Sequence, residues 1–252
     1  MSSKNVVGII PSRYGSTRLP GKPLKPILNV SMIQRVYERS LLCPDLSAVY
    51  IATDDERIQS AVEAFGGKAI MTSADCQSGT DRAAQAVQAI EADIVVNIQG
   101  DQPFIDPFMI QECVQPLLED SGVEMCTLMF PITKPEDLHD PAVVKIVVDL
   151  QGNTLYCSRS LIPFPRCETP HSVYEHIGLY VYTKEFLMRM AALPPTPLEQ
   201  IEMLEQLRVL EHGYKLRCIE TKCRDKEFHG FSVDTQEDLA RAEAMLRERD
   251  LE

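Results

Sequence analysis

The sequence lacks the marks of a membrane, secreted or nucleic-acid-binding protein. It has no apolar run of about 18 residues and no charged-then-apolar leader, so we expect neither a membrane span nor secretion. Positive charge is also scarce, because 25 Lys and Arg stand against 37 Asp and Glu, a formal net charge of -12 at pH 7. A phosphate backbone or an anionic membrane attracts a basic face, so we expect neither as a partner.

A second absence concerns the cysteines. None of the eight forms a C-x-x-C pair, which is typical of free thiols in a reducing cytoplasm, and we expect a cytoplasmic protein. Cys218 and Cys223, with His212 and His229 nearby, form a loose cluster. Their spacing matches no zinc signature, so we interpret them as unrelated thiols.

Two glycine fingerprints are missing as well. G-x-x-x-x-G-K-[ST] fails because Pro23 follows Lys22, and no G-x-G-x-x-G is present, so a P-loop NTPase and an NAD oxidoreductase are both disfavoured.

What is present is a short β-branched run that ends at Pro11 and leads into a loop holding Arg13, Arg18 and Lys22. Open α/β sheets bind ligands beyond the carboxyl ends of their strands, and small residues let backbone N–H groups approach phosphate oxygens. The loop therefore predicts a polyphosphate site. The alternative is a solvated basic loop.

Strand and helix patterns alternate along the first 120 residues. We predict strands at 49–53, 68–71, 93–98 and helices at 32–42, 54–65, 78–91, 107–119, followed by a strand at 125–131. This alternation predicts an α/β fold with a mostly parallel sheet and helices on both faces.

The rhythm changes at about residue 133. Strands at 143–149 and 154–158 form a predicted hairpin, residues 159–169 are proline-rich and irregular, and a strand is expected at 177–182. We interpret 133–182 as a smaller antiparallel β-rich lobe inserted into a single domain spanning 1–252. Helices at 183–192, 198–211, 236–249 and a strand at 214–220 complete the chain. In helix 198–211, the residues expected to face the core are Ile201, Leu204, Leu207 and Leu210.

Two acidic residues stand at special places. Asp101 follows the strand at 93–98, and Asp234 precedes the last helix. Nucleoside triphosphates are used as magnesium complexes, and Mg²⁺ takes only one or two carboxylates from protein, so this pair is a candidate metal site. The alternatives are an N-cap for Asp234 and a turn residue for Asp101.

Six motifs follow one another along nearly the whole chain: IPSRYGSTRLPGKPL (10–24), SGTDR (78–82), QGD (99–101), YCSR (156–159), HIGLY (176–180) and LEQLR (204–208). Together they resemble the 3-deoxy-manno-octulosonate cytidylyltransferases, the CMP-Kdo synthetases. The resemblance implies a Rossmann-type fold like that of nucleotide-diphospho-sugar transferases. It also implies a reaction in which CTP and a Kdo-type sugar acid give the CMP-sugar and pyrophosphate.

The resemblance also implies residue roles. The catalytic residues would be Arg13, Lys22, Asp101 and Asp234, the last two binding Mg²⁺. The nucleotide would be held by Ser12, Arg13, Lys22, Thr72, Ser73, Ser78, Gly79 and Gln99. The sugar acid would be held by Gln99, Arg159, Arg166, His176, Tyr180, Glu205 and Gln206. A homodimer built through the β-rich lobe, a bacterial cytoplasmic setting and a role in lipopolysaccharide biosynthesis are implied in the same way.

The sugar stays open between two relatives of one chemistry. Gln102 replaces the glutamate of the family's common Gly-Asp-Glu-Pro turn, which resembles the branch acting on 8-amino-3,8-dideoxy-manno-octulosonate. We keep Kdo as the first expectation and the amino sugar as the second. A CMP-sialate synthetase and a non-catalytic nucleotide-binding protein are further alternatives. The YCSR and HIGLY motifs argue against the first, and the retained cations and carboxylates argue against the second.

Overall fold

The computed structural model describes residues 4–16, 18–167 and 170–249. The chain divides into two compact units: unit 1 comprises residues 1–111 and 223–252, and unit 2 comprises residues 112–222. The boundary falls inside helix α4 (Pro107–Glu119). Within the described residues, no helix has the length and apolar character needed to cross a bilayer.

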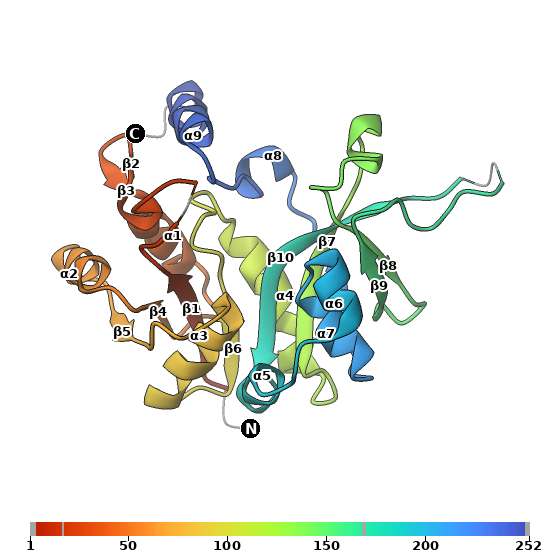
Figure 1. The fold of residues 1–252 in the computed structure, drawn as a ribbon, viewed down its shortest axis with the longest axis horizontal. Helices are drawn as coiled ribbons and strands as arrows, with labels where there is room; N and C mark the ends of the chain where they lie inside the picture. The colour runs from red at the N-terminus through yellow and green to blue at the C-terminus, as the bar shows by residue number, and fades with distance from the viewer. Residues whose placement is uncertain (1–3, 17, 168–169, 250–252) are drawn as a thin grey trace. The chain divides into compact units, whose positions relative to one another are not determined.

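Unit 1 is built on four parallel strands, β1 (Val6–Ser12), β4 (Ala48–Thr53), β5 (Ala69–Met71) and β6 (Ile94–Asn97). Their order is β6-β1-β4-β5, and Ile9 of β1 pairs with Tyr50 on one side and Asn97 on the other. The β-branched side chains of β1 are buried, as expected for a central strand covered on both faces. The predicted α/β class with a mostly parallel sheet is confirmed (Figure 1).

The helices α1 (Met32–Leu41), α2 (Glu56–Ala64) and α3 (Gly79–Ala86) connect these strands. The connections through α1 and α2 run toward β5, and the one through α3 returns to β6. Because such crossovers are right-handed, α3 lies on the face opposite to α1 and α2. The α2 N-cap is Asp55, and α3 begins with a capping box formed by Ser78 and Asp81.

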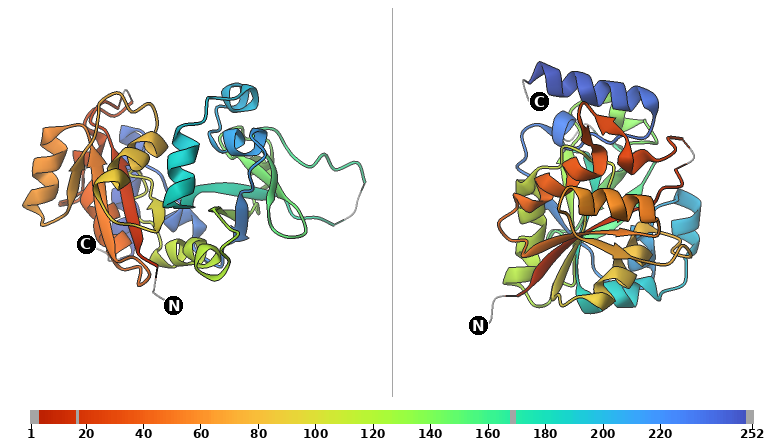
Figure 2. Two further views of the ribbon diagram at one scale, coloured as in Figure 1. Left: turned by 90° about the horizontal axis from the view of Figure 1, so that it is seen from below. Right: turned by 90° about the vertical axis from the view of Figure 1, so that its left-hand side faces the viewer.

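The C-terminal segment returns to unit 1 through α8 (Lys226–His229) and α9 (Gln236–Glu248). Leu239 and Leu246 of α9 join a buried cluster with Ile27 and Phe104. In Figures 1 and 2, α9 lies beside the short two-stranded sheet of β2 (Pro26–Ile27) and β3 (Val30–Ser31). The N-cap of α9 is Thr235, which forms a capping box with Asp238, so the alternative of Asp234 as the N-cap is wrong.

Unit 2 contains β7 (Met125–Pro131), β8 (Lys145–Val148), β9 (Thr154–Ser158), β10 (Tyr174–Thr183) and β11 (Arg217–Glu220). Strands β11 and β7 pair in parallel, whereas β7, β10, β8 and β9 form successive antiparallel pairs. The predicted hairpin is β8–β9, with Gly152 at φ 78° in its turn. Strand β10 begins three residues earlier than predicted. Residues 168 and 169 of the proline-rich stretch lie outside the described part of the chain.

The predicted helix at 198–211 is two helices, α6 (Pro197–Glu202) and α7 (Gln206–Glu211), with α5 (Lys184–Ala191) preceding them. Met203 ends α6 in the left-handed conformation, φ 54° and ψ 48°. The break turns the faces, so Ile201 is 77% exposed while Leu204 and Leu207 are buried. The expectation that Ile201 faces the core is therefore wrong, because the helical period does not continue through residue 203.

Candidate active site

One cavity of unit 1, of about 280 Å³, gathers seven of the predicted site residues. It lies where β1 and β6 end and where α3 begins, and the loop before α9 completes it. The carboxyl ends of parallel strands meet at one sheet edge, which is where α/β proteins bind ligands. The seven residues in its lining are Ser12, Arg13, Lys22, Gly79, Gln99, Asp101 and Asp234.

Close contact between two loops fixes one wall of this cavity. A Cβ atom at Gly100 would lie 2.9 Å from the carbonyl oxygen of Pro11 and 3.3 Å from Ser12 Oγ. Only glycine fits without movement of the backbone. Gly100 therefore lets the segment carrying Asp101 lie directly against the end of β1.

Lys22 is held between the two carboxylates. Its Nζ donates to Asp101 Oδ2 at 2.9 Å and to Asp234 Oδ1 at 3.0 Å, and its side chain is only 15% exposed. Burial alone would lower the pKa of Lys22, but the charges and hydrogen bonds of Asp101 and Asp234 outweigh burial and raise that pKa above 10.5. Lys22 therefore stays protonated at neutral pH. Arg18, more exposed, pairs with Asp234 at 3.0 Å.

The Ser12 hydroxyl is a polar group that still needs a partner. It is buried in the cavity lining, and its Oγ makes no hydrogen bond to any described residue. Buried hydroxyls are rarely left unpaired, since losing water without a replacement costs about 1–3 kcal/mol. A ligand in the cavity would supply that partner.

A second cavity, of about 190 Å³, shares Ser12, Arg13 and Gly79 with the first. Its other walls come from the turn before α3 and from α3 itself: Cys76, Gln77, Ser78 and Arg82. Of these, Cys76, Gln77 and Arg82 were not predicted as site residues. Arg82 is the last residue of the SGTDR motif, so its place in that motif was the signal that could have found it.

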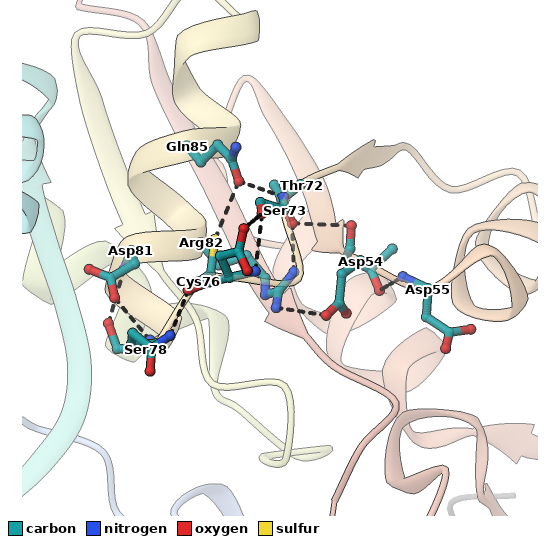
Figure 3. Close-up of polar contacts among 12 residues, drawn as sticks. Asp54, Asp55, Thr72, Ser73, Cys76, Ser78, Asp81, Arg82 and Gln85 are labelled. Carbon is teal, nitrogen blue, oxygen red and sulfur yellow. Dashed lines mark hydrogen bonds and ion pairs between the residues drawn. The ribbon is translucent and has the colours of Figure 1, made fainter.

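Figure 3 shows how Arg82 is held. Its side chain is almost completely buried, its Nη1 donates to Thr72 Oγ1 at 2.6 Å, and its Nη2 lies 3.3 Å from Asp54 Oδ2. The polar groups of Ser73 also make hydrogen bonds within the protein: its Oγ donates to Asp75 and its backbone N–H donates to Gln85. Neither Thr72 nor Ser73 is in the lining of these two cavities. In this structure both support the neighbouring residues of the wall.

In unit 2, three of the predicted sugar-binding residues come together. The rings of His176 and Tyr180 are 5.4 Å apart, and the Tyr180 hydroxyl donates to Gln206 Oε1 at 3.2 Å. His176 Nε2 lies 3.1 Å from the hydroxyl of Thr127, which is also 2.9 Å from two backbone carbonyls. Since that single hydroxyl proton serves a carbonyl, Nε2 is the donor to Thr127. Burial lowers the pKa of His176 to about 4, so the ring is neutral.

Arg159 is tied down by main-chain oxygens. Its Nε donates to Glu202 O and its Nη1 to Pro141 O, both at 2.8 Å. Glu202, which was not predicted, accepts from Ser158 Oγ at 2.6 Å and from Arg159 N at 3.0 Å. The break after α6 exposes the Glu202 and Met203 carbonyls that Arg159 uses.

Glu205 and Arg166, the other residues of unit 2 that were predicted to bind the sugar, have different surroundings. Glu205 is at the N-cap of α7 beside Gln206, whereas Arg166 is an exposed residue of the loop between β9 and β10. Among the contacts of the described residues, none joins the Arg166 side chain to His176, Tyr180 or Gln206.

A parallel α/β sheet with cations and two converging carboxylates around a cavity at its strand ends is typical of α/β proteins that bind phosphate-bearing ligands. Residues 7–226 match the family model described as cytidylyltransferase. The chain belongs to the cytidylyltransferase family.

Known relatives agree with this membership. A 3-deoxy-manno-octulosonate cytidylyltransferase of Syntrophotalea carbinolica is 48% identical over 96% of this chain and 99% of its own length. An 8-amino-3,8-dideoxy-manno-octulosonate cytidylyltransferase of Shewanella piezotolerans is 49% identical over 96% of this chain and 98% of its own. A solved structure of CMP:2-keto-3-deoxy-manno-octonic acid synthetase complexed with CTP superposes with a TM-score of 0.91 at 41% identity. The superposition covers 97% of this chain and 99% of that structure.

Proposed function

We propose that this protein transfers CMP from CTP to an eight-carbon sugar acid of the Kdo type. The anomeric hydroxyl oxygen attacks the α-phosphorus and loses its proton, and the bond from that phosphorus to the bridging oxygen breaks to release pyrophosphate. The observation that carries the proposal is that Ser12, Arg13, Lys22, Asp101 and Asp234 all line the same cavity. It combines cations for phosphate oxygens with oxygen donors for a metal.

The chain's own groups support a transfer without a protein nucleophile. Arg13 lines the two cavities described above, where its guanidinium suits bidentate contact with a phosphate. Lys22 keeps its charge and would offset the negative charge that develops on the departing pyrophosphate. The Ser12 hydroxyl would gain its missing partner from the nucleotide.

Asp101 and Asp234 fit a magnesium ion. Both carboxylates already converge on one cation, the Lys22 ammonium, at 2.9 Å and 3.0 Å. The donor set contains only oxygen, and Mg²⁺ commonly takes one or two carboxylates together with substrate phosphates. When bound, Mg²⁺ supplies charge neutralisation on the phosphate oxygens. Asp101 and Asp234 would hold it and orient it toward the nucleotide.

For the sugar acid we propose the residues of unit 2 named above, and the contact of Gln99 with the sugar stays a prediction from the family resemblance. A guanidinium such as that of Arg159 or Arg166 suits the sugar carboxylate, and the polar groups of His176, Glu205 and Gln206 suit its hydroxyls. Kdo is the first candidate. The amino sugar is the second, since a relative of equal similarity is named for it and Gln102 is buried with its Oε1 unpaired among the described residues.

The deciding experiment measures pyrophosphate release with CTP and Mg²⁺ for Kdo, 8-amino-Kdo and sialic acid in parallel. Asp101→Asn serves as a matched inactive control, and omission of Mg²⁺ tests the metal. We expect release with at least one octulosonate and none with sialic acid. Binding of CTP with no release for any sugar would instead support a non-catalytic nucleotide-binding protein.

We also infer a setting and an assembly. The eight cysteines are free thiols, which supports a reducing cytoplasm, and a Kdo-type product would serve lipopolysaccharide biosynthesis. A homodimer through the β-rich lobe is supported by large apolar side chains that the lobe leaves exposed: Leu150, Leu155 and Phe164.

A further inference from the structure

A second group of possible metal ligands lies in unit 1, among residues that the proposed reaction does not use. Asp106 precedes α4, Cys223 precedes α8, and His229 is the last residue of α8. The carboxylate oxygen, thiol sulfur and ring nitrogen that they offer all lie within 4.8 Å of one another. The three residues are half-buried, so the cluster is neither sealed in the core nor fully solvated.

The His229 ring is oriented as a metal ligand would be. Its Nδ1 lies 2.7 Å from the Phe104 carbonyl oxygen, and because a carbonyl only accepts, Nδ1 carries the proton. In the neutral ring the lone pair is then on Nε2. That nitrogen is 3.8 Å from Asp106 Oδ2, too far for a hydrogen bond. A ring fixed through its other nitrogen by a main-chain carbonyl is the usual arrangement of a metal-binding histidine.

Asp106 is fixed in the same manner. Its Oδ1 accepts a hydrogen bond from the Phe108 backbone N–H at 3.0 Å, at the start of α4. This contact leaves Oδ2 on the side of His229. The Cys223 sulfur lies within 4.8 Å of the ligand atom that Asp106 offers.

The frame that carries these ligands is packed rather than loose. The rings of Phe104 and Phe228 are stacked with centroids 4.4 Å apart, and both belong to a buried cluster. Phe104 is two residues from Asp106, and Phe228 is adjacent to His229. The ligand-bearing segments are therefore held together whether or not a metal is bound.

We propose that Asp106, Cys223 and His229 form a binding site for a divalent transition metal of the zinc class, with water as the fourth ligand. A mixed sulfur, nitrogen and oxygen set favours Zn²⁺ over Mg²⁺, which prefers oxygen alone. Tetrahedral zinc places its ligand atoms roughly 3.3–3.8 Å apart. Side-chain rotations that move these atoms by about 1 Å would therefore close the site. It is separate in chemistry from the all-oxygen pair Asp101 and Asp234.

The metal would link two segments that the active site depends on. The backbone N–H of Val233 donates to the Asp101 carbonyl oxygen at 2.9 Å, which joins the segment after β6 to the segment before α9. Asp106 lies on the first of these segments, and Cys223 and His229 lie just before the second. A metal at the cluster would therefore stabilise the region from which Asp101 and Asp234 project.

Cobalt provides a direct test, because a Co²⁺–thiolate bond gives a charge-transfer band in the near ultraviolet and tetrahedral Co²⁺ gives intense visible bands. We would titrate chelator-treated, reduced full-length protein with Co²⁺ alone and then displace it with Zn²⁺. We expect one equivalent bound with the thiolate band. Cys223→Ser should abolish that band, and His229→Gln should weaken binding by about 100-fold or more. The matched controls Cys167→Ser and His139→Gln should behave as wild type.

The proposal is overturned if no thiolate band appears at stoichiometric Co²⁺, or if Cys223→Ser keeps the band. Circular dichroism checks that each variant is folded. Should Cys223→Ser fail to fold, Asp106→Asn and the melting temperature of the wild type with Zn²⁺ or with EDTA decide the question. An unchanged melting temperature together with unchanged Co²⁺ binding by Asp106→Asn would also overturn it. None of these readings depends on nucleotide transfer.

Discussion

At the scale of single residues, Lys22 has a contact that sequence reasoning did not provide. The loop motif indicates a cation for phosphate, and the structure adds that this cation lies between Asp101 and Asp234. Two carboxylates around one buried ammonium form a small charged network. Removing the ammonium leaves like charges facing each other in a partly buried place, which is costly.

We predict that Lys22→Ala lowers kcat by about 100-fold or more and changes the KM for the sugar less than about threefold, because the lost charge acts on the phosphates. Steady-state kinetics with the sugar identified by the pyrophosphate assay measures both quantities. Lys25→Ala, a lysine just after the same short helix η1 (Lys22–Leu24), is the matched control. An unchanged kcat in Lys22→Ala would remove Lys22 from the reaction.

His176 supports a prediction about pH. Its pKa is about 4 in the folded protein and 6.5 as the ordinary value, so the unfolded chain binds the proton more readily. Stability from the neutral ring is therefore fully present above pH 6.5 and is lost as the pH falls toward 4. The loss should be about 1–3 kcal/mol, reduced because part of the residue reaches solvent.

Urea unfolding at pH 7.5 and pH 5 measures this effect. We expect His176→Gln to show a smaller loss of unfolding free energy between the two pH values than the wild type. The exposed His139 offers the control, since His139→Gln should keep the wild-type dependence. Equal pH dependence in wild type and His176→Gln would contradict the assignment of a neutral ring to His176.

At the scale of elements, local patterns predicted where most strands and helices begin. Ser78 with Asp81 and Asp55 before α2 are caps formed within a few residues, so the sequence contains their whole cause. The break between α6 and α7 has a different cause. Its apolar spacing predicts one continuous helix. The left-handed turn at Met203 is accompanied by tertiary contacts, among them those of Glu202 with Ser158 and Arg159.

A left-handed conformation at a methionine is strained by roughly 1–2 kcal/mol. Asparagine tolerates this conformation, and the Met203 side chain is 77% exposed, so little burial is lost on replacement. We predict that Met203→Asn raises the free energy of unfolding by several tenths to about 1 kcal/mol. Urea denaturation measures it. Ile201→Asn, equally exposed but inside α6, should be neutral or slightly destabilising, and the same result for both variants would contradict the strain.

At the scale of the whole molecule, the acidic net charge does not describe the surroundings of the candidate site. The chain carries a net charge of -12, yet Arg13, Arg18 and Lys22 are concentrated around one cavity of unit 1. The expectation that nucleic acid is not the partner rests on this acidic remainder and stays a prediction. A small polyphosphate meets the local cations rather than the average charge of the surface.

The sequence by itself determined the alternation of strands and helices, the caps, and the residue types at the strand ends, because each depends on neighbours within a few positions. It also contained the motifs that place the chain in its family. Only the tertiary structure decided which distant groups meet. Lys22 and Asp234 are 212 residues apart and in contact. Asp106 meets Cys223 and His229, and Arg82 is buried beside Asp54. Periodicity encodes local conformation, whereas the pairing of remote side chains depends on how the packed elements bring their ends together.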